Sequence, residues 1–116
     1  MFPISRQAES LTRLAHEAAF RHQVLSRNLA NVNTPHYQRE DVVLNSEPAS
    51  ASSVPGNFQE AGLRIVKDST PSLRTDGNNV DLEQELGAIE QNSLAYQSVL
   101  QLLAAQISAL RTAIQG

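Results

Sequence analysis

Apolar residues along the first 33 positions recur at alternating spacings of four and three. The stripe consists of Ile4, Ala8, Leu11, Ala15, Ala18, His22, Leu25, Leu29 and Val32, with His22 as its polar member. This seven-residue repeat predicts an amphipathic helix with a stripe of the coiled-coil kind. Pro3 suits a first helical turn, and Pro35 disfavours helix at Thr34. We therefore expect an N-terminal helix over residues 1–33, with Asn33 as its closing residue.

Residues 81–116 carry a longer repeat of the same kind. Its stripe consists of Leu82, Leu86, Ile89, Ser93, Tyr96, Leu100, Leu103, Ile107, Leu110 and Ile114. Asp81 is a good N-cap, and Gln84 three residues later completes a capping box. The pattern predicts a C-terminal helix over residues 81–116, roughly 50 Å long at about 1.5 Å per residue.

Residues 34–80 have no sustained period and are predicted to be rich in turns. Residues 41–44 and 63–66 favour short strands, neither of which has an evident partner. Residues 45–57, NSEPASASSVPGN, have the composition of a flexible surface loop. The sequence thus predicts a mainly α fold. Long N- and C-terminal helices pair as an antiparallel coiled coil and form one domain, with an irregular middle segment that holds short β-strands.

Charge favours the antiparallel orientation. Residues 1–33 carry a net charge of +2 and residues 81–116 a net charge of −3. An antiparallel pair places the acidic start of the second helix beside Arg21 and Arg27, and brings Arg111 toward Glu9. Each exposed ion pair contributes about 0.2–1 kcal/mol, so charge selects the orientation and the apolar stripes supply the stability. The residues expected at this interface are Leu11, Leu25, Leu29, Leu86, Ile89, Tyr96, Leu100, Leu103, Ile107 and Leu110.

Both helices carry more apolar residues than one stripe requires. The additional residues are Leu14, Ala19, Phe20 and Val24 in the first helix, and Ala88, Leu94, Ala95, Val99, Leu102, Ala109 and Ala113 in the second. A two-helix hairpin cannot bury both faces, and contiguous exposed apolar surface usually marks an interface. Either the middle segment covers the second face, or neighbouring copies or sister proteins do. The few large apolar residues of the middle segment favour the neighbours.

Composition excludes several classes of function. The chain has 116 residues, which is one domain at most. A net charge of −3 argues against nucleic-acid binding. The absence of cysteine excludes disulfides, thiolate metal sites and cysteine nucleophiles. The first ten residues have no apolar core of signal-peptide length, and no run approaches the roughly 20 apolar residues of a membrane span.

Candidate catalytic and metal-binding residues are also few. His16, His22 and His36 do not have the spacing of a metal site. Glu83 and Glu85 are explained by the favourable electrostatics of a helix start. We therefore expect neither a cofactor nor an enzymatic activity.

Two segments resemble a known family. SRNLANVNTPHYQRED, residues 26–41, resembles the N-terminal signature of the flagellar axial proteins, the rod and hook family, with the pattern Asn-x-x-Asn-x-x-Thr-Pro-Gly-Tyr. The matching positions are Asn28, Leu29, Ala30, Asn31, Asn33, Thr34, Pro35 and Tyr37. DGNNVDLEQE, residues 76–85, and NSLAYQ, residues 92–97, are similar to the proximal rod proteins of this family.

The resemblance implies a structural subunit of the flagellar basal-body rod in the periplasmic space. Its terminal helices would pack into the tube that transmits torque and encloses the export channel. The implied partners are copies of itself, other rod and basal-body proteins, and the flagellar type III apparatus, which would export it without a cleaved signal peptide. A soluble coiled-coil adaptor or secretion chaperone is the alternative, because it would share the apolar stripes and the acidic charge.

His36 departs from the family pattern, which usually has glycine there. A Pro-Gly pair suits a type II turn, whose third residue has a positive φ. Histidine at such a position is strained. Either the turn differs in this chain, or the His36 side chain makes a compensating contact.

Overall fold

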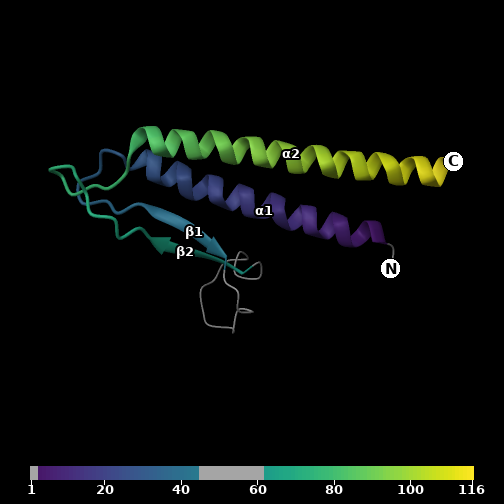
Figure 1. Cartoon of the computed structure of the whole chain (residues 1–116), viewed down its shortest axis with the longest axis horizontal. Helices are drawn as coiled ribbons and strands as arrows, with labels where there is room; N and C mark the ends of the chain where they lie inside the picture. The colour runs from purple at the N-terminus through teal and green to yellow at the C-terminus, as the bar shows by residue number, and fades with distance from the viewer. Residues whose placement is uncertain (1–2, 45–61) are drawn as a thin grey trace.

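Two long helices and a two-stranded sheet make up the computed structural model, which describes residues 3–44 and 62–116 (Figure 1). The elements are α1 (Pro3–Ala30), β1 (Glu40–Leu44), β2 (Leu63–Lys67) and α2 (Leu82–Gln115). The molecule is 65 Å long. The mainly α fold with long terminal helices is confirmed. The loop predicted over residues 45–57 lies outside the described residues.

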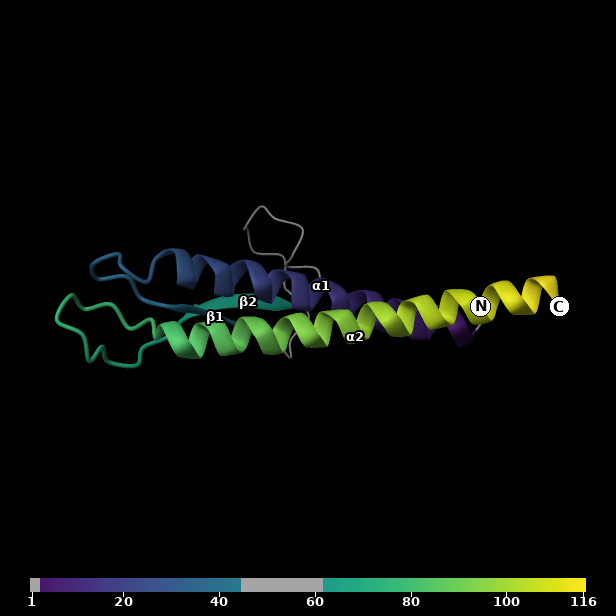
Figure 2. The same cartoon turned by 90° about the horizontal axis from the view of Figure 1, so that it is seen from above.

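The two helices lie side by side and run in opposite directions, so that the start of α1 and the end of α2 share one end of the molecule (Figures 1 and 2). Asp81 is the N-cap of α2, and its Oδ1 accepts the backbone N–H groups of Glu83 and Gln84 at 3.0 and 3.3 Å. This side chain satisfies two of the N–H groups that a helix start leaves without partners.

The first helix ends at Ala30, three residues before the predicted Asn33. The Asn31 side chain explains the difference, because its Nδ2 donates to the carbonyl of Arg27 at 2.8 Å. The backbone N–H of Asn31 is shared between the carbonyls of Arg27 and Asn28 at 3.1 and 3.2 Å. The last turn therefore tightens, and the chain leaves the helix before Asn33.

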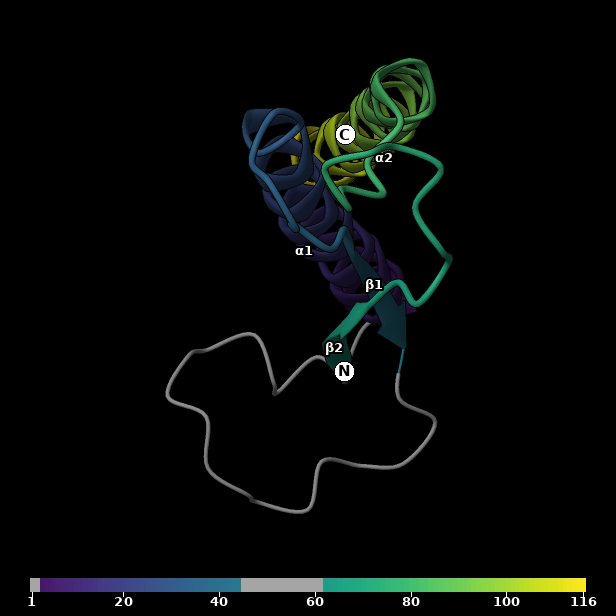
Figure 3. The ribbon, with the colours of Figure 1, turned by 90° about the vertical axis from the view of Figure 1, so that its left-hand side faces the viewer.

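The two strands pair with each other, although neither has an evident partner in the sequence pattern. They are antiparallel, in a register that runs from Glu40 opposite Lys67 to Leu44 opposite Leu63. Figure 3 shows α1 between this hairpin and α2. The core between α1 and the hairpin consists of Phe20, Val24, Val42 and Leu63. Phe20 and Val24, two of the apolar residues outside the stripe of α1, thus find their partners in the middle segment, whereas Leu14 and Ala19 are exposed.

The C-terminal helix is rotated relative to the prediction. Most of its stripe remains exposed, with exposed fractions of 43 to 77% at Leu82, Leu86, Leu100, Ile107, Leu110 and Ile114, and we refer to these six residues as the apolar stripe of α2. Tyr96 is also exposed. The buried or half-buried residues of α2 include Glu85, Ala88, Ile89, Asn92, Val99, Leu103 and Gln106 instead. Of the predicted interface, Leu11, Leu25, Leu29, Ile89 and Leu103 are at least half-buried.

The predicted charge pairing between the helices is not found. Arg21 pairs with Glu17 at 3.2 Å, and Arg27 pairs with Glu40 at 2.9 Å. Over residues 3–44 and 62–116, no ion pair joins α1 to α2. The acidic start of α2 meets Arg39 of the middle segment, which comes closer than the arginines of α1. In the same part of the chain, neither helix is apolar over enough of its length to cross a membrane.

Candidate functional site

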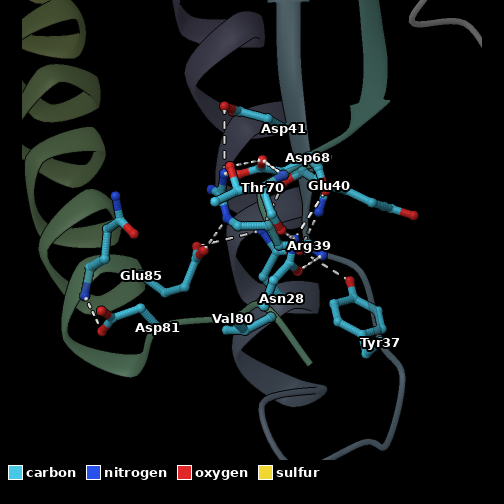
Figure 4. A network of polar contacts seen from close by, with 12 residues as sticks. Asn28, Tyr37, Arg39, Glu40, Asp41, Asp68, Thr70, Val80, Asp81 and Glu85 are labelled. Carbon is cyan, nitrogen blue, oxygen red and sulfur yellow. Dashed lines mark hydrogen bonds and ion pairs between the residues drawn. The ribbon is translucent and has the colours of Figure 1, made fainter. Parts of the chain in front are cut away.

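Polar side chains gather where the end of α1 meets the start of α2. They come from residues 28–41 and 68–85, and we call these two segments together the joint (Figure 4). The joint contains most of the predicted family signature. Its three fully buried polar side chains are those of Asn28, Asn78 and Glu85.

Asn28, near the end of α1, bonds through both ends of its amide to the segment at the start of β1 and to the start of α2. Its Nδ2 donates to the carbonyl of Glu40 at 2.8 Å and, at 3.4 Å, to Oε2 of Glu85 on α2. Its Oδ1 accepts the hydroxyl of Tyr37 at 3.0 Å and the backbone N–H of Glu40 at 2.9 Å. A side chain needs a donor and an acceptor at fixed positions to do this, which an amide provides. Asn28 therefore holds the start of β1 and the start of α2 against the end of α1.

Glu85 forms a buried ion pair with Arg39. Arg39 Nε lies 2.6 Å from Glu85 Oε1, and Arg39 Nη1 lies 2.9 Å from Asp68 Oδ2. A fully buried carboxylate is costly unless it is paired with a cation and hydrogen-bonded. Arg39 is the cation for Glu85, and Asn28 donates the further hydrogen bond. Burial acts to lower the pKa of Arg39, but its hydrogen bonds to Glu85 and Asp68 outweigh burial and raise that pKa. The guanidinium thus stays charged and joins α2 to the segment that follows β2.

Two neighbouring groups have shifted titrations. Hydrogen bonds from Thr70 and Arg39 lower the pKa of Asp68 to about 2. Burial, together with the charge of Glu40, raises the pKa of Tyr37. Asp68 is therefore ionised and Tyr37 protonated near neutral pH, which are the states that their hydrogen bonds require.

Asn78 caps the chain that leaves α1. Its Nδ2 lies 2.8 Å from the carbonyls of Asn31 and Thr34 and 3.1 Å from that of Val32, while its Oδ1 accepts the backbone N–H of Val80 at 2.8 Å. Carbonyls beyond a helix end lack partners in the helix itself, and a distant asparagine provides them here.

Asn79 binds the other side of the joint. Its Oδ1 accepts the backbone N–H of Arg39 at 2.7 Å, and its Nδ2 donates to the carbonyls of Asp68 and Thr70 at 3.0 and 3.1 Å. The consecutive asparagines of the DGNNV segment therefore face different partners. Asn78 holds the turn after α1. Asn79 holds the residue before β1 against the segment that follows β2.

His36 has a positive φ of 61°. The other described residues with a positive φ are glycines. Its backbone N–H donates to the carbonyl of Asp76 at 2.8 Å. The opposing residue is Gly77, where a Cβ would lie 2.8 Å from Nδ1 of His36. The turn thus has the backbone that favours the glycine of the family pattern, with histidine in its place.

Half of the predicted signature residues bond within the chain through their side chains. Asn28, Asn31, Thr34 and Tyr37 form side-chain hydrogen bonds, and Thr34 donates to Oδ1 of Asn31 at 3.1 Å. Leu29 is half-buried, whereas Ala30, Asn33 and Pro35 are exposed. Their role in assembly stays a prediction.

Sequence reasoning missed the partners of the signature. Arg39, Asp68, Asn78 and Asn79 were not singled out as site residues, and Glu85 was explained by helix-start electrostatics alone. The family-like DGNNVDLEQE segment was the signal that could have found three of them. Among the described residues, no group of histidine, aspartate and glutamate side chains has the arrangement of a metal site. The polar groups of the joint are engaged with one another, which suits them to hold a fixed geometry.

Comparison with known proteins gives consistent relatives. No protein-family model matches the sequence. The chain is 34% identical to the flagellar basal body rod protein FlgB of Aquifex aeolicus, over 83% of this chain and 82% of that protein. It is 37% identical to the flagellar basal body rod protein FlgB of Cereibacter sphaeroides strain ATCC 17023, over 83% of this chain and 84% of that protein. The protein of the same name from Bacillus subtilis is 24% identical over 93% of this chain.

Proposed function

Because the chain belongs to the FlgB family of flagellar basal body rod proteins, we propose that it is a structural subunit of the proximal rod. In this role it assembles through its terminal helices into the tubular structure that transmits torque and encloses the export channel. The relatives do not support the alternative of a soluble adaptor or secretion chaperone, since those described above are rod proteins by name. A structural role of this kind involves no enzymatic activity.

The apolar stripe of α2 is the observation that carries the proposal of assembly through the helices. Its six large aliphatic side chains lie along one face of the helix and are each at least 43% exposed. Such a surface is unfavourable in water, and burial against neighbouring helices would contribute roughly 1 kcal/mol for each half-exposed side chain. The proposed partners on this face are copies of the chain and the other rod proteins.

The joint supports the same role in a different way. It fixes the angle at which α1 and α2 leave the turn region, through Asn28, Asn78 and Glu85. A subunit in a tube must present its helices to its neighbours in one geometry, because each interface is repeated around the tube. We assign the hydrogen-bonded signature residues to this task, and not to direct contact with neighbours.

The remaining proposals concern export and location. We place the assembled protein in the periplasmic part of the basal body, delivered there by the flagellar type III apparatus with its N-terminus uncleaved. N-terminal sequencing of the subunit from purified basal bodies tests this. A sequence that starts at or next to Met1 is expected, and a start well inside the chain would contradict export without cleavage.

A substitution on the stripe tests assembly. Leu100→Asp places a charge in the middle of the apolar stripe, and Gln101→Asp places the same charge on the neighbouring exposed residue. Each variant replaces the native protein in a motile strain. We expect Leu100→Asp cells to lose swimming and to lack the subunit in purified basal bodies, whereas Gln101→Asp cells swim.

The two readouts separate the ways in which the proposal could fail. Normal swimming and normal incorporation of Leu100→Asp would contradict assembly through this face. Protein that is abundant in the soluble fraction and absent from basal bodies even without substitution would contradict the rod function itself.

A further inference from the structure

Three polar residues of α2 occupy equivalent positions in the heptad that faces α1. Glu85, Asn92 and Gln106 are separated by seven and fourteen residues, and we call them the polar ladder. Each one contacts α1. Glu85 Oε2 accepts from Asn28, Asn92 Nδ2 donates to the carbonyl of Ala18 at 2.8 Å, and Gln106 Nε2 donates to Gln7 Oε1 at 2.8 Å.

The partners on α1 follow in the reverse order, as an antiparallel pair requires. Asn28, Ala18 and Gln7 meet the ladder from its first to its last member. Asn92 and Ala18 are both buried, at 9% and 8% exposed. The small alanine side chain lets the amide of Asn92 reach the helix backbone, which few residue pairs would allow.

The observed face leaves large aliphatic side chains of α2 exposed. Leu86 and Ile107 each follow a ladder residue directly, and they are 48% and 59% exposed. Meanwhile Gln106 has a buried Oε1 that accepts no hydrogen bond within the described part of the chain. A rotation of α2 that turned its apolar stripe toward α1 would bury aliphatic side chains and expose these amides. Burial energy alone therefore does not explain the observed face.

We propose that the polar ladder sets the register and the rotation of α2 on α1. A slip of α2 leaves the Asn92 amide opposite another part of the helix and separates Glu85 from Asn28 and Arg39, so buried polar groups lose their partners. Polar residues at otherwise apolar contact positions are an established means of specifying register. Apolar contacts are non-directional and would accept several alignments. By holding the ladder against α1, the chain keeps its apolar stripe on the outside.

This inference concerns contacts inside one chain and does not depend on membership of a rod. Its test is the distance between two spin labels in the full-length chain. The chain contains no cysteine, so labels attach at Gln23→Cys and Ser108→Cys alone, and both positions are exposed. Double electron–electron resonance is recorded in sucrose buffer, diluted with unlabelled protein so that only distances within a chain are seen.

The test variant carries Asn92→Leu and Gln106→Leu. Leucine is a good helix former, and in the native alignment Glu85 keeps its pair with Arg39. The control carries Gln91→Leu and Gln101→Leu, two leucines added at exposed positions of the same helix. We expect one narrow distance for the unsubstituted chain and the control. We expect the test variant to show a broadened distribution with an added distance displaced by about 10 Å, the length of a one-heptad slip at about 1.5 Å per residue.

Two results would overturn the proposal. A single distance that is unchanged in the test variant would show that Asn92 and Gln106 do not set the register, which contradicts the ladder as proposed. Loss of helix in the test variant, measured by circular dichroism while the control stays helical, would show that the amides stabilise the pair and do not select its alignment. A second distance with full helix content supports the ladder.

Discussion

The two ends of the helix pair are built in opposite ways. At the joint, buried polar side chains have partners within the chain, and Asn28, Asn78 and Glu85 are fully buried. At the far end, where α1 begins and α2 ends, the two helices form an open groove of about 580 Å³. Its lining residues are Arg6, Gln7, Ser10, Leu11, Leu102, Ala105, Gln106 and Ala109. Every residue of α2 beyond Gln106 is exposed.

This contrast shows which end is complete without a partner. Hydrogen bonds and buried ion pairs are directional, so the polar side chains of the joint are satisfied in one geometry without a neighbour. Exposed aliphatic side chains at the far end gain from any apolar surface that covers them. We infer that the polar side chains of the joint fix the shape of the subunit, and that the apolar stripe of α2, most of which lies beyond the joint, binds its neighbours. The following predictions test this contrast, from the largest expected effect to the smallest.

Removal of the buried carboxylate should have the largest effect on stability. Glu85→Ala leaves Arg39 without its closest partner and Asn28 without a contact to α2. Breaking a buried pair typically costs about 3–5 kcal/mol in the free energy of unfolding. Glu83→Ala is the matched control, since Glu83 is an exposed glutamate in the same helical turn and should change stability by less than about 0.5 kcal/mol. Urea unfolding of both variants provides the comparison, and equal losses would contradict a special role of the joint.

The signature asparagines should differ sharply from one another. Asn28→Ala leaves the hydroxyl of Tyr37 and both backbone groups of Glu40 without their partner, and we expect a loss of about 2–3 kcal/mol. Asn33→Ala, in the same signature but exposed, should cost a few tenths of a kcal/mol. Thermal unfolding of the two variants measures the difference. A large loss of stability in Asn33→Ala would show that the contribution of these asparagines to stability does not follow their burial.

The elements that sequence predicted well are those set by local chemistry. The heptads of both helices and the Asp81 cap depend on residues within a few positions of one another, and both helices formed close to their predicted bounds. The pairing of residues 40–44 with 63–67 was missed because its partners are separated by a long intervening segment, so no local pattern joins them.

The face of α2 was harder to predict for a physical reason. The predicted apolar stripe and the observed buried face share Ile89 and Leu103. Sequence patterns favour burial of the more apolar of the two faces, which is the predicted stripe. The observed face contains Glu85 and Asn92, whose burial depends on Asn28, Arg39 and Ala18, far away in the sequence. Polar residues that are buried because of distant partners look like solvent-exposed residues when only their own helix is considered.

Acid should weaken the joint before it affects the apolar contacts. The pKa of Asp68 is lowered from 3.8 to about 2, so its ionised form stabilises the folded chain above about pH 4, and this contribution is lost as the pH falls toward 2. We expect Asp68→Asn to cost about 1 kcal/mol at pH 7, after allowance for solvent screening, and the difference from the unsubstituted chain to narrow between pH 4 and 2.

Asp41→Asn is the control for this prediction, because Asp41 is 3.8 Å from the same arginine and its side chain is 46% exposed. Unfolding curves at a series of pH values measure both variants. A difference between Asp68→Asn and the unsubstituted chain that stays constant from pH 7 to pH 2 would show that the Asp68 carboxylate does not contribute through its charge.

The smallest expected effect is at the strained residue of the joint. His36 has a φ of 61°, a conformation that costs a residue with a side chain about 1–2 kcal/mol. Glycine removes this cost but has more freedom to lose on folding, which offsets about 0.5–1 kcal/mol of the gain. His36→Gly should therefore stabilise the chain by about 0.5 kcal/mol and raise the melting temperature by roughly 3 °C. His36→Ala keeps the strain and lacks the ring, so it should give no gain. If both variants melt lower than the unsubstituted chain, the imidazole beside Gly77 makes a stabilising contact, and the joint gains from a side chain that its backbone disfavours.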